Sequence, residues 1–133
     1  NFLIKQLDVY LDKYPETDLI FVSTDDINFL EFLKSNFFKV PITYNKDSFR
    51  SNDNKSTHLS GRNLYDVNLD AITNCLLLSK CTRLMKTASI LSAWSKLFNP
   101  ILPIISLSKP KDRFNFFPDK QVAETTLYKV SNF

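Results

Sequence analysis

Two patterns of apolar residues alternate along this chain. Short segments that we interpret as strands occur at residues 18–23, 40–44, 83–87 and 101–107. Segments in which apolar residues recur at helical spacing occur at residues 2–13, 27–38, 66–80 and 88–98. Strands that alternate with helices through short connections pair in parallel. The pattern therefore predicts an α/β fold in which helices flank one open parallel sheet.

The length of 133 residues fits a single domain followed by a short tail. We expect residues 1–108 to form the domain. Residues 109–133 are expected to pack back on it as a C-terminal tail, because this segment carries Phe114, Phe116 and Phe117. The chain starts without Met, directly in a helical pattern, so we expect it to be a piece of something longer.

Composition excludes several classes of site. The single glycine, Gly61, rules out phosphate loops built from several glycines. Cys75 and Cys81 lack metal-ligand spacing, and we interpret them as buried free thiols of a reducing compartment. No metal site is expected. The net charge of +3 comes from scattered basic residues, so nucleic acid is a weak candidate partner. No apolar run approaches the ~18 residues of a transmembrane segment.

The helical patterns also predict which side chains are buried. The segment 66–80 is apolar over a wide arc, which is typical of a deeply buried helix. In the last helix, Leu91, Trp94 and Leu97 share a stripe that we expect to face inward. Trp94→Ala is then expected to cost ~3–5 kcal/mol, as truncation of a buried aromatic does.

Ligands of an open parallel sheet bind beyond the carboxyl ends of its strands. The most informative segment there is Lys86-Thr87-Ala88-Ser89, where a strand leads into a helix whose start carries hydroxyls and no carboxylate. Free N–H groups and the helix dipole favour an anion at such a place, and Lys86 adds positive charge. The alternative is that Thr87 or Ser89 only caps the helix.

Two further segments reach the same edge. Asp25 and Asp26 either bind a metal or sugar hydroxyls, or cap the following helix. His58 lies in a long polar loop over residues 45–65, where a histidine is either a solvated side chain or a catalyst. We expect residues 46–64 to be mobile without ligand, because few apolar side chains anchor them. No catalytic residue can be assigned from spacing.

Two strings resemble the C-terminal signatures of the fucosyltransferase superfamily, which includes nodulation, core α1,6- and protein O-fucosyltransferases. They are DLIFVSTDDINFLEFLKSNF at residues 18–37 and AITNCLLLSKCTRLMKTASILSAWSKLFNP at residues 71–100. His58 falls between them, where relatives often carry a histidine. Their order and spacing together are more specific than either string alone, and the resemblance covers roughly residues 2–106.

The resemblance implies the Rossmann-like C-terminal half of a GT-B glycosyltransferase, which inverts the sugar anomer without a required metal or cofactor. It implies that Thr87, Ala88, Ser89 and Ile90 grip the diphosphate of a nucleotide sugar, a GDP-sugar such as GDP-fucose. Asn74 stands where relatives usually have an Asp that accepts hydrogen bonds from guanine. On this interpretation, Asn74→Asp is expected to strengthen GDP binding.

The implied function is donor binding in glycan or polysaccharide synthesis. The partners would be a nucleotide sugar, a glycan acceptor and a missing N-terminal domain with the family's basic motif, so this chain alone would not be active. The setting would be cytoplasmic in a bacterium, possibly at the membrane, and the Golgi or endoplasmic reticulum lumen in a eukaryote. The alternative is a degenerate, non-catalytic α/β binding module, to which the Asn74 departure points.

Overall fold

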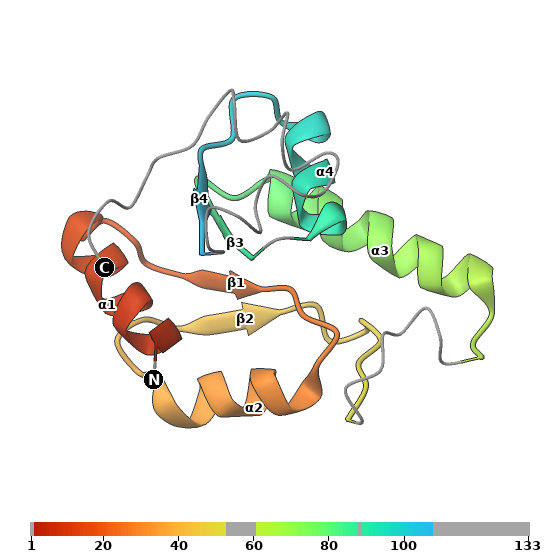
Figure 1. Cartoon of the computed structure of the whole chain (residues 1–133), viewed down its shortest axis with the longest axis horizontal. Helices are drawn as coiled ribbons and strands as arrows, with labels where there is room; N and C mark the ends of the chain where they lie inside the picture. Colours follow the sequence, from red (N-terminus) through yellow and green to blue (C-terminus); the bar gives the residue numbers. More distant parts are fainter. Residues whose placement is uncertain (1, 53–60, 88, 108–133) are drawn as a thin grey trace. The chain divides into compact units, whose positions relative to one another are not determined.

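The computed structural model describes residues 2–52, 61–87 and 89–107 of the chain (Figure 1). Helices and strands alternate along it in the order that the sequence predicts. The elements are α1 (Phe2–Lys13), β1 (Ile20–Val22), α2 (Ile27–Asn36), β2 (Ile42–Tyr44), α3 (Leu64–Ser79), β3 (Leu84–Lys86), α4 (Ile90–Phe98) and β4 (Ile104–Ser106). The chain divides into two compact units, Asn1–Val67 and Asn68–Phe133, with the boundary in the first turn of α3.

Unit 1 contains a parallel strand pair with its connecting helix. Ile20 pairs with Ile42 and Val22 with Tyr44 (Figure 1). Helix α2 connects the two strands in the sequence. The helical spacing places Leu30, Leu33 and Phe37 on one apolar stripe, which is buried, with Leu30 at 1% exposure. Phe37 closes the helix by donating its N–H to the carbonyl of Leu33. Apolar burial along this stripe is what holds a short helix against its strands.

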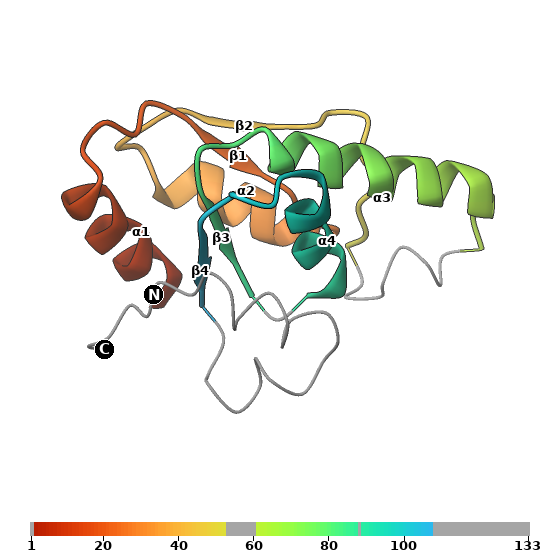
Figure 2. The same ribbon diagram turned by 90° about the horizontal axis from the view of Figure 1, so that it is seen from above.

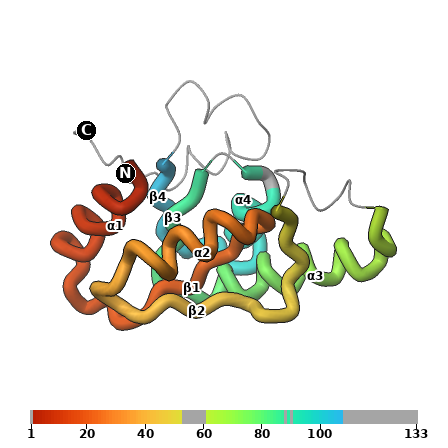
Figure 3. Tube along the Cα trace, turned by 90° about the horizontal axis from the view of Figure 1, so that it is seen from below, coloured from red at the N-terminus to blue at the C-terminus, as the bar shows by residue number. Residues whose placement is uncertain are grey.

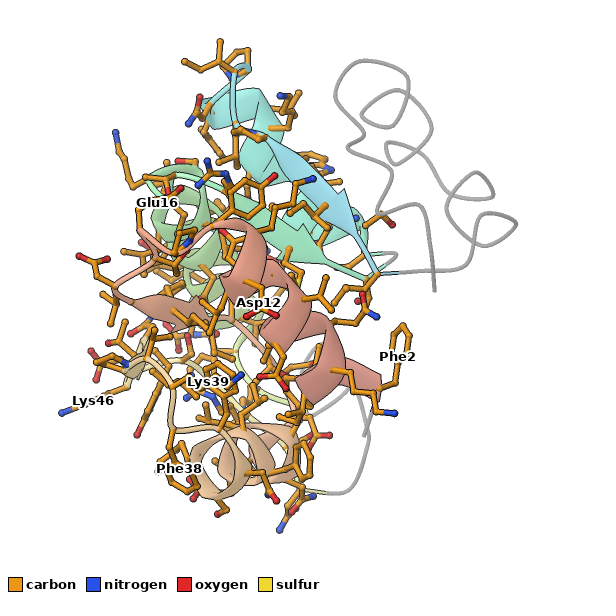
Figure 4. The ribbon with its side chains drawn as sticks, turned by 90° about the vertical axis from the view of Figure 1, so that its left-hand side faces the viewer. Phe2, Asp12, Glu16, Phe38, Lys39 and Lys46 are labelled. Carbon is orange, nitrogen blue, oxygen red and sulfur yellow. The ribbon has the colours of Figure 1, made fainter. Side chains whose placement is uncertain are left out.

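Helix α1 is joined to the chain after α2 by an ion pair. The Lys39 ammonium lies 2.7 Å from the Asp8 carboxylate, and Figure 4 shows Lys39 between the two helices. Hydrogen bonding to that carboxylate raises the pKa of Lys39. The Lys39 side chain is 56% and the Asp8 side chain 36% exposed, so solvent screens the pair and it contributes little to stability. The Leu7 side chain of α1 is buried.

Unit 2 repeats the same strand-helix-strand order. Leu84 pairs with Ile104 and Lys86 with Ser106, again in parallel, with α4 between the strands along the chain (Figure 2). Two hydrogen bonds join α3 to α4: the Cys75 thiol donates to the carbonyl of Leu91, and the Asn99 side-chain amide donates to that of Ser79 at 2.9 Å. The C-terminal ends of α3 and α4 therefore lie together.

The mixed α/β class with parallel strand pairing is confirmed, whereas one continuous sheet is not. The described strands form two separate two-stranded sheets, β1-β2 and β3-β4. Figure 3 traces the chain through each pair and its helix in turn. Every strand has three residues, so each pair is held by few hydrogen bonds. The predicted tail, residues 109–133, lies outside the described residues.

Two predictions of burial are wrong. Helix α3 is not deeply buried all round, because Leu69 and Ile72 are each about half exposed. In α4 the predicted inward stripe faces outward, with Trp94 47% and Leu97 65% exposed. Helix α4 instead buries small and polar residues, including Ala93 at 0% exposure. A periodic pattern identifies the residues that share a face, but small side chains on the opposite face allow closer backbone packing.

Candidate functional site

The turn from β3 to α4 carries the strongest site expected from the sequence. Lys86 ends β3 and its side chain is buried, while its carbonyl accepts a hydrogen bond from the Leu107 N–H at 2.8 Å. Thr87 is exposed, and α4 begins at Ile90. A buried lysine therefore immediately precedes an exposed strand-to-helix turn. Ala88 lies outside the described residues.

Ser89 is the N-cap of α4. Its hydroxyl accepts a hydrogen bond from the Ser92 N–H at 3.5 Å, and the Ser92 hydroxyl donates to the Ser89 carbonyl at 3.2 Å. The capping function is thus present, but its N···O distance is at the outer limit for a hydrogen bond. The N–H groups of Ile90 and Leu91 come too early in the helix to have an intrahelical partner.

The charges along α4 favour an anion at its N-terminus. The first turn has no acidic residue and the last turn contains Lys96. The Lys96 ammonium is buried and donates to the Leu102 carbonyl at 2.7 Å, and burial lowers the pKa of Lys96. A cation at the C-terminal end and free N–H groups at the N-terminal end both agree with the direction of the helix dipole.

Asn74 lies on the buried side of α3, with 7% of its surface exposed. Its side-chain amide donates to Asp70 twice, to the carboxylate at 2.8 Å and to the backbone carbonyl at 3.0 Å. The amide nitrogen is therefore already used within the helix. Asp70 is not among the residues predicted from the sequence, although a spacing of four residues places two side chains on one face of a helix.

Asp25 and Asp26 belong to unit 1, at the start of α2. The Asp26 carboxylate accepts from the Asn28 N–H at 2.9 Å, so Asp26 is the N-cap of α2. The backbone beside it is also paired: the Ile27 N–H donates to Ser51, and the Ser51 N–H donates to the carbonyl of Asp25. These contacts agree with the capping interpretation of Asp26. The Asp25 side chain is exposed.

Asp26→Ala is expected to lower the free energy of unfolding by about 1 kcal/mol, because the helix loses the carboxylate that satisfies one of its first N–H groups. Asp25→Ala is the matched control, since the neighbouring side chain is exposed and its substitution is expected to stay within about 0.5 kcal/mol. Denaturant melts followed by circular dichroism compare the two. Equal losses would show that the carboxylate of Asp26 does not act as a cap.

The polar loop is anchored where it is described. The Arg50 guanidinium donates to the carbonyls of Asn45 and Ser48, and it lies over the Tyr44 ring. Arg62 lies over the ring of Phe49, 4.6 Å from its centroid. The described part of the loop is therefore held by hydrogen bonds and cation–π contacts. His58 and the rest of residues 53–60 lie outside the described part.

The predicted site residues that the structure describes belong to two units. Lys86, Thr87, Ser89 and Ile90 are brought together by the β3–α4 turn, and Asn74 lies in the same unit on α3. Asp25 and Asp26 belong to the other unit. Within residues 2–52, 61–87 and 89–107, no group of three or more His, Cys, Asp or Glu side chains could hold a metal ion.

Two further observations bear on the class of protein. Both cysteines are free; Cys75 is buried and Cys81 half-buried, and burial raises the pKa of each thiol. None of the helices in the described ranges combines the length and apolar character that a membrane span needs. Comparison of the chain with protein-family models, with curated proteins and with solved structures finds no match.

Proposed function

We propose that this chain is the donor-binding part of an inverting glycosyltransferase, and that it holds the diphosphate of a nucleotide sugar, GDP-fucose or a related GDP-sugar, at the β3–α4 turn. One observation carries the proposal: buried Lys86 ends a parallel strand, and a three-residue turn leads from it into a helix whose first turn has no acidic residue. The N-terminus of such a helix is a preferred place for phosphate groups. The resemblance to fucosyltransferases supports the choice of donor.

The chemistry expected of this turn is stabilisation of the leaving group. When the bond between sugar and diphosphate breaks, negative charge develops on the phosphate oxygens. The Lys86 ammonium and the N–H groups of Ile90 and Leu91 would stabilise that charge, and backbone groups already fixed by a helix need little rearrangement to do so. The acceptor site and a general base would come from a further, N-terminal domain, as the resemblance implies.

A degenerate module that binds without catalysis is the second candidate. The observation that favours it is Asn74, whose amide donates to Asp70 and which replaces the aspartate expected to accept from guanine. An aspartate accepts from both N–H groups of the guanine edge, whereas an asparagine has one acceptor oxygen. A domain that keeps the diphosphate turn but has lost base selection would bind GDP, UDP and ADP equally.

The test uses the backbone of the turn. Ile90 is the first helical residue, where proline is tolerated because the N–H has no intrahelical partner. Ser89 has φ −146° and ψ 125°, an extended conformation compatible with a following proline. Ile90→Pro therefore removes one N–H from the proposed site and leaves the helix intact. We expect wild-type affinity for GDP near millimolar, about −4 kcal/mol, and binding several-fold weaker in Ile90→Pro.

Ile90→Ala is the control, because it shortens the side chain and keeps the N–H. Amide-shift titrations of wild type and both variants with GDP, UDP and ADP give the affinities, and circular dichroism checks the fold. If GDP moves no resonances near Ser89 in the wild-type chain, the donor-binding proposal is wrong. Equal affinity for the three nucleotides, with the Ile90→Pro effect retained, favours the non-catalytic module.

A further inference from the structure

Large apolar side chains of helix α4 are exposed, while two of its polar side chains are buried. Ser95 is 0% and Lys96 7% exposed. The exposed residues, which we name the α4 stripe, are Leu91, Trp94, Leu97, Phe98 and, just after the helix, Ile101. Ile101 is the most exposed of them, at 87%. Clustered apolar side chains of this size are typical of an interaction surface.

The charge of this part of the chain indicates the kind of partner. Residues 71–111 contain no Asp or Glu. Among the basic side chains described in unit 2, Lys80 is exposed and Arg83 half-buried, whereas Lys86 and Lys96 are buried. The stretch that forms the α4 stripe therefore carries no carboxylate to repel an anionic partner, and the exposed Lys80 would attract one.

One of these cations is placed beside the α4 stripe. The side-chain amide of Asn99, the C-cap of α4, donates to the Ser79 carbonyl at 2.9 Å. Lys80, which is exposed, directly follows Ser79, so it lies at the end of unit 2 where Phe98 ends its helix. An exposed lysine next to exposed aromatic and aliphatic side chains matches the anionic headgroups and the acyl boundary of a membrane surface.

We propose that the α4 stripe is a peripheral docking surface for membranes that contain anionic lipids. Trp94 and Phe98 enter the interfacial layer, where aromatic side chains are favoured, and Lys80 contacts the headgroups. A second copy of the chain is a poorer occupant, because face-to-face association would bring two Lys80 side chains and two acid-free segments together. Lys96 takes no part, since it is buried against Leu102.

Trp94 is the sole tryptophan of the chain, so it reports directly on the surface. The full chain is mixed with vesicles of phosphatidylcholine alone or with added phosphatidylserine, and binding is followed by co-sedimentation and Trp94 fluorescence. We expect binding only to the mixed vesicles, a blue shift of Trp94 emission, and weaker binding at high salt. No nucleotide is present, so the result is independent of donor binding.

Two variants and two matched controls test the surface. Leu97→Ser is expected to lower partitioning onto the mixed vesicles about tenfold, because one large apolar side chain no longer enters the interface. Lys80→Gln is expected to lower it about fivefold, the effect of one basic residue near an anionic surface. Phe38→Ser and Lys46→Gln change exposed residues of unit 1, both labelled in Figure 4, and are expected to leave partitioning unchanged.

Three outcomes would overturn the proposal, provided that circular dichroism shows the variants to be folded. The first is no sedimentation and no Trp94 shift with either vesicle. The second is equal partitioning of wild type and Leu97→Ser. The third is a dimer in size-exclusion chromatography that Leu97→Ser dissociates, which assigns the α4 stripe to a second copy of the chain.

Discussion

Ile104→Ala is expected to lower the free energy of unfolding by about 2–5 kcal/mol. Ile104 is 1% exposed in β4, and its backbone pairs with that of Leu84, itself buried in β3. Truncation leaves a cavity in addition to the lost apolar contacts, because a packed interior closes only in part around a missing side chain. A chemical denaturation curve followed by Trp94 fluorescence measures the loss in unit 2.

The control for this variant lies three residues earlier. Ile101→Ala makes the same chemical change at a side chain that is 87% exposed, so the loss is expected to stay within about 0.5 kcal/mol. Trp94→Ala, whose unfolding is followed by circular dichroism because the variant has no tryptophan, is likewise expected to cost well under the ~3 kcal/mol lower bound for a buried aromatic, since nearly half of Trp94 is exposed. If Ile101→Ala and Ile104→Ala lowered the free energy of unfolding equally, the difference in burial between these two side chains would be contradicted.

Asn74→Asp is expected to destabilise the chain by about 2–4 kcal/mol at neutral pH, between the cost of a buried unsatisfied group and that of a buried unpaired charge. The variant removes the amide that donates to Asp70 and places a second carboxylate beside the first, where the amide nitrogen lies 2.8 Å from the Asp70 oxygen. Burial and the neighbouring charge both raise the pKa of the new carboxyl group.

The raised pKa of the new carboxyl group makes the stability of Asn74→Asp depend on pH. A carboxyl group whose pKa is raised on folding binds more protons in the folded state, so stability falls as pH rises through its range. The deficit of Asn74→Asp should therefore shrink toward acidic pH. The double variant Asp70→Asn with Asn74→Asp restores one donor and one acceptor and should recover most of the loss. Denaturant melts over a pH series measure the free energy of unfolding of the wild type and both variants. A loss of stability that does not change with pH would contradict the explanation by like charges.

The expected loss of stability of Asn74→Asp determines the conditions under which its GDP affinity is measured. The family resemblance predicts stronger GDP binding for Asn74→Asp, whereas the position of Asn74 beside Asp70 predicts a less stable helix. The gain in affinity is therefore measured where the variant is folded, below neutral pH or in the double variant. Binding of GDP by the variant alone would indicate that the natural domain has changed its donor or lost its activity.

The sequence predicts the elements well because each has a local signal. Asp26 accepts from the N–H of Asn28 at the helix start, and the stripe of Leu30, Leu33 and Phe37 is buried as the helical period requires. The outward face of α4 could not be predicted in this way. Leu91, Trp94 and Leu97 do share one side, but whether that side meets the strands depends on residues distant in sequence.

The candidate site was predictable only in part, for a similar reason. Lys86 and Ser89 are neighbours along the chain, so their placement on one turn follows from the strand and helix boundaries alone. The separation of Asp25 from them into another unit depends on how strands pair, which four short apolar runs do not specify. The absence of acidic residues over 71–111, by contrast, is readable in the sequence without any structure.

The pairing of each strand with the next one along the chain has a consequence for how the chain folds. Ile20 and Ile42 are 22 positions apart, and Leu84 and Ile104 are 20 apart, whereas Ile20 and Ile104 are separated by 84. The entropy lost in closing a loop grows with the logarithm of its length, so pairing β1 with β4 first would cost about 1 kcal/mol more than either observed pairing. Each strand-helix-strand segment can therefore nucleate by itself, and the search for the correct partner is confined to roughly two dozen residues of chain.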